Sequence, residues 1–292
     1  MRHQSPSSWA VICVFIAAVV HLALGFSIEF SVDEAHYALY AQHLAWSYFD
    51  HPPLVGWIQW PLVALTSSEG VIRFIPELLW IISSYLVYQV TIELHRLIQG
   101  RNAGYLTSAL PSANLCGLLA VLIIIAAPML HVLAIGLLPD TLLAPLSLAL
   151  MLMALRWLRK DQFSIGDWIV TGILLGLAGL SKYTAAFTAF ALLFVFLSSP
   201  RKSWFTKLGF WLAALTALLL ISPVLYWNWV NDWISFKYQL AHGGGGEWLW
   251  RRLAAYIGIQ ILVFGPLFIL GFAIFVKDCM HGARSEERRV GK

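Results

Sequence analysis

The chain has 292 residues, of which 60% are hydrophobic and only 12% charged, and its formal net charge is +4 at neutral pH. Soluble domains carry about twice this share of charged residues, so the composition excludes a soluble enzyme, a disordered chain, a disulfide-stapled secreted domain and a nucleic-acid-binding protein. It predicts an all-α protein that crosses a membrane several times.

Apolar segments long enough, or nearly long enough, to span a membrane occur at eight places. They are residues 9–28, 71–93, 113–128, 139–157, 168–181, 184–199, 204–227 and 253–276. The fifth and sixth are short, and we expect them to form a bent pair around Ser181 and Lys182. Residues 57–66 are apolar but too short to span and are broken by prolines, including Pro61, which favours an interfacial or re-entrant piece.

The basic residues predict the orientation of the chain. With the N-terminus inside, the inner segments up to Lys277 hold ten Lys and Arg residues and the outer segments hold five. The first outer loop, residues 27–70, has five acidic residues and no Lys or Arg. This bias predicts a cytoplasmic N-terminus. The first apolar segment is long and lacks a clear cleavage site, so we expect an uncleaved anchor rather than a signal peptide.

Residues 31–43 predict an amphipathic helix directly after the first span. Asp33, His36, Tyr37 and Tyr40 recur on one face at helical spacing. A membrane-surface helix whose charges contact lipid headgroups explains this pattern. The alternative is an acidic site at the mouth of the bundle.

The next turn presents Asp50 and His51 from a rigid loop. Pro52 and Pro53 fix the backbone and favour an extended conformation at His51. His51 could be a phosphate ligand, a metal ligand or a capping group, and a turn or capping role is the default interpretation of this residue alone.

Three further charged positions stand out near the outer ends of spans. A bare carboxylate within the bilayer costs roughly 2.5–3.5 kcal/mol, so Asp140 is either the N-cap of a helix after Pro139 or a site residue that faces the first loop. Snorkelling to the interface explains Lys182 without a function. Arg73 and Glu77 are four residues apart, which favours a structural ion pair, although Arg73 lies near the outer surface and could contact an anion.

Residues 223–246 combine many aromatic side chains with four consecutive glycines at 243–246. An interfacial aromatic belt and a mobile loop explain them first. The polar side chains of the segment could instead shape a pocket for a sugar or a lipid headgroup; they are Asn228, Asp232, Lys237 and His242.

Several segments, in order, resemble the bacterial members of the dolichyl-phosphate-mannose protein mannosyltransferase superfamily, which includes the aminoarabinose transferase that modifies lipid A. They are Asp33-Glu-Ala-His-Tyr, Tyr48-Phe-Asp-His-Pro-Pro-Leu, Pro139-Asp-Thr-Leu, Gly176-Leu-Ala-Gly-Leu-Ser-Lys-Tyr-Thr, and Pro223 through Trp227-Asn to Ser235-Phe-Lys-Tyr-Gln. The resemblance implies a GT-C membrane domain over residues 1–276. Relatives continue with further spans and often a periplasmic domain, so we expect this domain to be an N-terminal portion. Residues 277–292 form a charged tail that resembles vector-derived sequence.

The resemblance implies a glycosyltransferase of the bacterial cytoplasmic membrane. Such enzymes take a sugar from a polyprenyl phosphate and pass it to a lipid, glycan or protein acceptor on the outer face. Asp33 matches the acid of the first-loop motif, so we expect it to act as general base or to orient the acceptor. Asp140 matches the second acid, with an expected role in binding the acceptor or stabilising charge.

The resemblance also suggests the phosphate ligands. Asp50 and His51 stand where the aminoarabinose enzymes have Glu-Lys-Pro-Pro, with Lys as a ligand of the donor phosphate, and a His in that slot makes phosphate binding sensitive to pH. Lys182 and Arg73 become candidates to neutralise the leaving phosphate. Four more residues complete the expected donor or substrate site: Glu34, His36, Tyr183 and Asn228.

We expect no required cofactor and, besides donor and acceptor, only membrane lipids as partners. A divalent metal could bind among Asp33, Glu34, His36 and His51, but no spacing demands one. Two other classes remain open: a transporter or lipid flippase, for which inverted repeats would be expected, and an inactive relative that only binds polyprenyl phosphate. We find no such repeat in the sequence.

Overall fold

The computed structural model describes residues 5–100, 111–159, 163–198, 202–243 and 249–264, together with 271, 273, 274 and 277. Within these ranges the secondary structure is entirely helical, which confirms the all-α prediction. The helices are α1 (Pro6–Gly25), α2 (Val32–Gln42), α3 (Leu54–Leu65), α4 (Glu69–Ile72), α5 (Phe74–Gly100), α7 (Ala113–Ile125), α8 (Pro128–Ile135), α9 (Pro139–Arg159), α10 (Ile165–Ser181), α11 (Ala185–Ser198), the 3₁₀ helix η1 (Lys202–Thr206), α12 (Leu208–Val230), α13 (Ile234–Gly243) and α14 (Trp250–Phe264).

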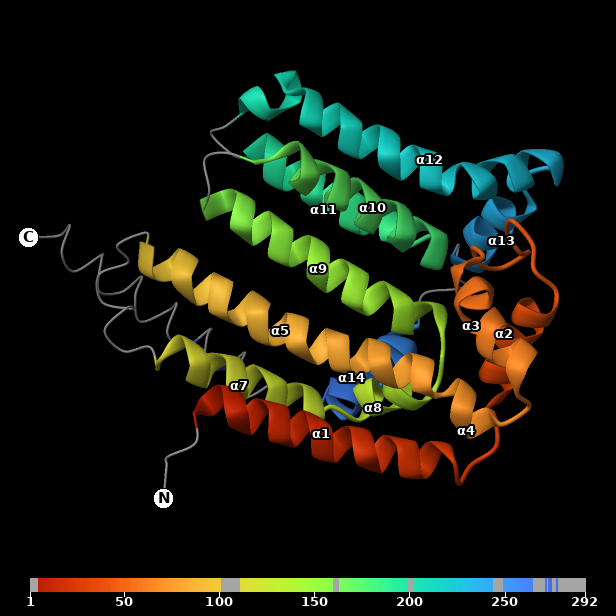
Figure 1. The fold of residues 1–292 in the computed structure, drawn as a ribbon, viewed down its shortest axis with the longest axis horizontal. Helices are drawn as coiled ribbons and strands as arrows, with labels where there is room; N and C mark the ends of the chain where they lie inside the picture. The colour runs from red at the N-terminus through yellow and green to blue at the C-terminus, as the bar shows by residue number, and fades with distance from the viewer. Residues whose placement is uncertain are drawn as a thin grey trace, which may run out of the picture.

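The long helices lie side by side as a bundle (Figure 1). α5 packs against α7 and α9, and α10 packs against α9 and α12. Among the described residues, four segments are long and apolar enough to cross a membrane: α1, α4 with α5, α9 and α12. The pair α7 and α8, which meet at a bend of 76°, could form a fifth span.

The other predicted spans are shorter or only partly described. α10 has 17 residues and α11 has 14, fewer than the roughly 20 that a typical span needs. The expected break between them lies between Ser181 and Ala185. The eighth predicted segment is described only as α14 and a few isolated residues, and the tail beyond Lys277 lies outside the described residues.

The helices α2, α3, α4 and α13 form a layer across one end of the bundle (Figure 1), here called the outer layer. The prediction that residues 57–66 are broken by proline is wrong, because α3 continues through Pro61 to Leu65. An interior proline costs the helix one hydrogen bond and crowds the carbonyl of residue i−4, and α3 tolerates both at Pro61. The short apolar helix therefore survives with Pro52 and Pro53 directly before it.

Two apolar clusters hold the bundle and the outer layer together. One lies between α9, α10, α11 and α12 and contains the aromatic rings of Trp157, Trp168 and Phe196. The other lies where α2 and α3 meet the start of α9 and contains Tyr37 and Leu142 among its buried residues. The second cluster fixes the outer layer on the spanning helices, and the polar residues described next surround it.

Candidate active site in the outer layer

The helix α2 begins with a capping box and carries the predicted polar face. Ser31 Oγ accepts a hydrogen bond from Glu34 N at 3.3 Å, and Glu34 Oε2 accepts one from Ser31 N at 2.9 Å. Asp33 and His36 are exposed, whereas Tyr37 and Tyr40 are buried. The predicted face is thus divided between surface groups and groups that pack on the bundle.

Tyr37 lies among carboxylates from three separate parts of the chain. Burial raises its pKa, and the negative charges of Asp50, Asp33 and Asp140 raise it further, in that order. The phenol therefore stays protonated and can donate a hydrogen bond. All three predicted acids therefore lie within electrostatic range of this phenol.

Asp50 is held by groups from α2 and α13. Tyr40 Oη donates a hydrogen bond to Asp50 Oδ1, and His36 Nε2 lies 3.3 Å from Asp50 Oδ2. Gln239 Nε2 donates to the Asp50 carbonyl at 2.7 Å. Burial, followed by the hydrogen bond to Asp50, raises the pKa of Tyr40. The Asp50 carboxylate consequently has a fixed position with its side chain 21% exposed.

His51 faces this cluster with one ring nitrogen unused. Its Nδ1 atom is buried and has no hydrogen-bond partner among the described residues, and its ring centre lies 5.6 Å from that of Tyr37. Burial lowers the pKa of His51, which Asp50 opposes and Lys182 reinforces. His51 does not cap α3, because Pro53 is the N-cap residue and no side chain forms a capping hydrogen bond there.

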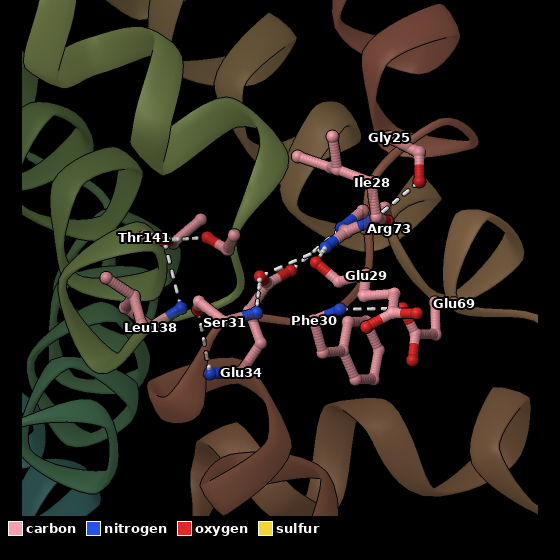
Figure 2. Close-up of polar contacts among 11 residues, drawn as sticks. Gly25, Ile28, Glu29, Phe30, Ser31, Glu34, Glu69, Arg73, Leu138 and Thr141 are labelled. Carbon is pink, nitrogen blue, oxygen red and sulfur yellow. Dashed lines mark hydrogen bonds and ion pairs between the residues drawn. The ribbon is translucent and has the colours of Figure 1, made fainter.

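Asp140 and Lys182 form an ion pair beside this cluster. Lys182 Nζ lies 2.7 Å from each carboxylate oxygen of Asp140. The interpretation of Asp140 as a helix N-cap is wrong, because it lies within the first turn of α9, after Pro139. Thr141 Oγ1 instead accepts a hydrogen bond from Leu138 N at this end of the helix (Figure 2). The pair leaves the Asp140 side chain 49% exposed and that of Lys182 25% exposed.

The Arg73 side chain forms its hydrogen bonds with the first loop and the end of α1 and is not open to solvent (Figure 2). Its Nε donates to Glu34 Oε1 at 2.8 Å and its Nη2 donates to Glu34 Oε2 at 3.1 Å. Its other contacts are the carbonyls of Gly25 and Ile28, each at 2.6 Å, and of Glu29 at 2.9 Å. A guanidinium has five N–H groups, and these contacts use all of them.

Two predictions are corrected by this geometry. The expected ion pair of Arg73 with Glu77 is wrong, since Arg73 pairs with Glu34, and Glu77 contacts His21. Arg73 and Glu34 are also both buried. In this structure they fix the first loop and offer no free group to a phosphate.

Asn228 and Tyr183 lie beneath the site. Asn228 is 0% exposed; its Nδ2 donates to Tyr183 Oη at 3.4 Å and its Oδ1 accepts from Ser235 N at 3.2 Å. Tyr183 Oη lies 3.3 Å from Ser47 Oγ. These groups join the α12–α13 turn to the loop that carries Asp50, so their geometry is that of supporting residues.

Two residues of α13 that the sequence patterns do not single out also support the loop that carries Asp50. Ser235 Oγ donates to the Tyr48 carbonyl at 2.9 Å, and Gln239 binds the Asp50 carbonyl. They are four residues apart and therefore share one helix face. The four-residue spacing of Ser235 and Gln239, within the segment Ser235-Phe-Lys-Tyr-Gln that resembles the family, was the feature of the sequence that could have identified them.

No group of three or more His, Cys, Asp or Glu side chains in the described part of the chain is arranged to hold a metal ion. Glu34, one member of the expected set, is turned toward Arg73. The set of Asp33, Glu34, His36 and His51 is therefore not assembled in this structure.

Comparison with known proteins identifies the family. The model of the family described as dolichyl-phosphate-mannose-protein mannosyltransferase matches residues 50–227. This chain belongs to that family. The matched range contains Asp50, His51, Asp140 and Lys182, and it begins after Asp33. Membership supports the GT-C architecture expected from the sequence.

A curated protein is also similar over most of the chain. The lipid A galacturonosyltransferase RgtD of Rhizobium johnstonii is 25% identical over 270 residues, which cover 89% of this chain and 51% of that protein. The chain thus spans about half the length of this relative. No solved structure matches the chain.

Proposed function

We propose that this protein is a glycosyltransferase that moves a sugar from a polyprenyl-phosphate donor to an acceptor at the outer face of the bacterial cytoplasmic membrane. The observation that carries the proposal is the contact of Asp50 with His36 and Tyr40, with the Asp140–Lys182 ion pair at the same end of the bundle, in a chain of the mannosyltransferase family. The family match also supports the membrane setting. The excess of Lys and Arg in the inner segments supports the orientation.

The proposed reaction has two requirements. The phosphate already activates the sugar, so the protein must position or deprotonate the acceptor hydroxyl and stabilise the departing phosphate. Asp33 is exposed at the start of α2, and a carboxylate there meets the first requirement as general base or acceptor-orienting group. Lys182 meets the second, because Asp140 holds its ammonium group at the same end of the bundle.

His51 and Asp50 complete the proposed donor site. The unpartnered Nδ1 of His51 is a hydrogen-bonding atom for a phosphate oxygen. Asp50, fixed by Tyr40 and flanked by His36, is placed to accept hydrogen bonds from sugar hydroxyls. We include no metal or other cofactor in this proposal.

The acceptor class is proposed from the relative. RgtD is named for transfer of galacturonic acid to lipid A, so a lipid is the first acceptor to test, with glycan and protein acceptors after it. The exposed side chains of Asp140 and Asp33 would face this acceptor.

The test measures sugar transfer from synthetic polyprenyl-phosphate sugars in membranes that contain this chain. We expect Asp33→Asn to abolish transfer while donor binding is retained, because the amide keeps the size of the side chain but cannot accept a proton. Asp167→Asn, an equal change in the N-terminal turn of α10, serves as the matched control.

Other outcomes separate the competing functions. Equal transfer by wild type and Asp33→Asn would contradict the role of Asp33. Donor binding without transfer by folded wild-type protein would favour a binding-only relative. Movement of the donor across proteoliposome membranes without transfer would favour a flippase.

A further inference from the structure

A series of hydrogen bonds joins three titratable side chains between α1, α5 and α8, about one helical turn from the Arg73–Glu34 pair. His21 on α1 lies with its Nδ1 atom 3.0 Å from Glu77 Oε2 on α5. Its Nε2 atom lies 2.6 Å from His131 Nδ1 on α8. His131 Nε2 in turn lies 2.6 Å from the carbonyl oxygen of Ile125. His21 and Glu77 are each only 3% exposed.

The number of protons in this series of hydrogen bonds follows from its last acceptor, the Ile125 carbonyl oxygen. A carbonyl oxygen can only accept, so His131 Nε2 must carry a proton. Each of the other two contacts also needs one hydrogen between its two atoms. Two neutral imidazoles supply two of the three protons required. The cluster of His21, His131 and Glu77 therefore holds one additional proton, and its net charge is zero.

The remaining carboxyl oxygen indicates where this proton lies. Glu77 Oε1 is buried and has no hydrogen-bond partner within the described ranges. A carboxylate would leave a charged oxygen without solvation, whereas a carboxylic acid leaves only a neutral carbonyl oxygen there. We propose that Glu77 is a neutral acid that donates its Oε2 proton to His21 Nδ1, which makes the cluster a proton-binding site within the membrane.

The position of the cluster of His21, His131 and Glu77 indicates which helices the additional proton holds together. Ile125 is the last residue of α7, and α7 and α8 meet at a bend of 76°. Carbonyls at the end of a helix lack intrahelical partners, and His131 supplies one. The protonated cluster therefore ties α1 and α5 to the broken span, and α8 leads directly to Pro139 and Asp140.

Two glutamate-to-glutamine substitutions give a sharp test, because the proposal predicts almost no loss of stability for one and a large loss for the other. In Glu77→Gln the amide N–H replaces the acid O–H as donor to His21 Nδ1 and keeps the charge at zero. We expect its melting temperature in detergent or nanodiscs to change by about 2 °C or less. Glu34→Gln keeps the capping box but removes the carboxylate of the buried Arg73 pair. We expect it to lower the melting temperature by about 6 °C or more.

Infrared spectroscopy supplies the second readout. Wild-type protein at neutral pH should show the carbonyl band of a protonated carboxylic acid, which Glu77→Gln removes and Glu34→Gln retains. Absence of that band in the wild type would overturn the proposal. A loss of stability in Glu77→Gln as large as that in Glu34→Gln would overturn it too, since it would indicate a carboxylate paired with an imidazolium. If Glu34→Gln fails to fold, the band and the stability of Glu77→Gln still decide the matter.

Discussion

Burial separates the residues that can perform chemistry from those that hold the outer layer. Arg73 is 2% exposed and has five acceptors around its guanidinium. A buried charge is tolerated only when it is paired and its hydrogen-bonding groups are satisfied. Lys182 has the opposite character, because it has one carboxylate partner and stays 25% exposed. Of these two cations, Lys182 is therefore the one that remains available to a substrate anion.

The Arg73–Glu34 pair gives a prediction for stability. Arg73→Met leaves the buried carboxylate of Glu34 without its partner, and we expect the free energy of unfolding to fall by about 3–5 kcal/mol. Adding Glu34→Gln removes the stranded charge and should recover part of the loss. Denaturant unfolding of both single variants and the double variant checks this. A double variant no more stable than Arg73→Met would contradict the coupling.

The pKa of His51 gives a prediction for pH dependence. Burial lowers this pKa below the usual 6.5, with Asp50, Lys182, Asp140 and His36 as the facing groups. His51 is therefore neutral at pH 7 and gains a positive charge only as the pH falls through its lowered pKa. Because a charged donor binds phosphate more strongly than a neutral one, we expect the KM for the lipid donor to fall about tenfold over that range.

His51→Lys should remove this pH dependence and keep the KM low at pH 7, since a lysine stays charged there. His36 is a second histidine beside Asp50, so His36→Gln is the control and should retain the dependence. KM values measured across the pH range decide the outcome. A similar profile in wild type and His51→Lys would show that another group is responsible.

At the scale of helices, glycines of α10 allow a close contact with α12. A Cβ atom at Gly172 would lie 2.4 Å from the carbonyl oxygen of Ala213, and one at Gly176 would lie 2.6 Å from the Leu220 side chain. Small residues allow helix backbones to approach closely in membranes. This contact holds the helix that ends beside Lys182 against the helix that leads to α13.

Gly172→Ala should therefore destabilise the protein by about 1–3 kcal/mol, because the obstructing atom belongs to the backbone and cannot rotate away. Gly258→Ala on α14 is the matched control, since nothing lies within 4 Å of its added Cβ atom. That substitution should stabilise the helix slightly, by about 0.5–1 kcal/mol. Thermal unfolding of the two variants tests the contrast, and equal effects would contradict close packing at Gly172.

The helix α13 should influence activity through the Asp50 loop. Gln239→Ala removes the hydrogen bond to the Asp50 carbonyl, and we expect sugar transfer to fall about tenfold with little change in melting temperature. Lys237→Ala changes an exposed residue of the same helix and should keep wild-type activity. Transfer rates and melting temperatures measured in parallel check this. Unchanged transfer in Gln239→Ala would show that α13 does not position the loop.

Local features of the fold were predictable from the sequence, and distant pairings were not. The helix over residues 31–43 and the break at Ser181 follow from spacing and apolar patterning, and the structure shows both. The pairing of Arg73 with Glu34 joins residues 39 positions apart, and the nearer Glu77 was the wrong choice. Partners of buried charges depend on how helices pack, which local periodicity does not specify. That Asp140 faces the first loop, which carries Asp50, was one of two interpretations left open by the residues, and the family resemblance favoured it.

At the scale of the whole molecule, the two ends of the bundle differ in charge. The outer layer holds the acidic first loop, whereas Arg156 and Arg159 lie in the last turn of α9 at the other end of the bundle. Large apolar side chains such as Leu218 and Leu219 of α12 are exposed in the protein alone, which fits a surface that contacts lipid. These features together support the orientation with the outer layer outside.

Cysteine labelling tests this orientation. In a background without native cysteines, Val32→Cys should react with an impermeant thiol reagent added to intact spheroplasts, because Val32 is 87% exposed in the outer layer. Lys207→Cys, at an exposed position before α12, should react only after the membrane is permeabilised. The reverse pattern would contradict a cytoplasmic N-terminus.

The absence of Lys and Arg from residues 27–70 has a consequence for how a substrate would arrive. Carboxylates at the mouth of a site lower the local concentration of dissolved anions, and the effect weakens as salt increases. A phosphate attached to a membrane lipid is less affected, because its apolar tail keeps it in the bilayer and it arrives by lateral diffusion. The charge of the first loop would thus discriminate between two sources of the same headgroup, excluding the one in solution and admitting the one delivered along the membrane.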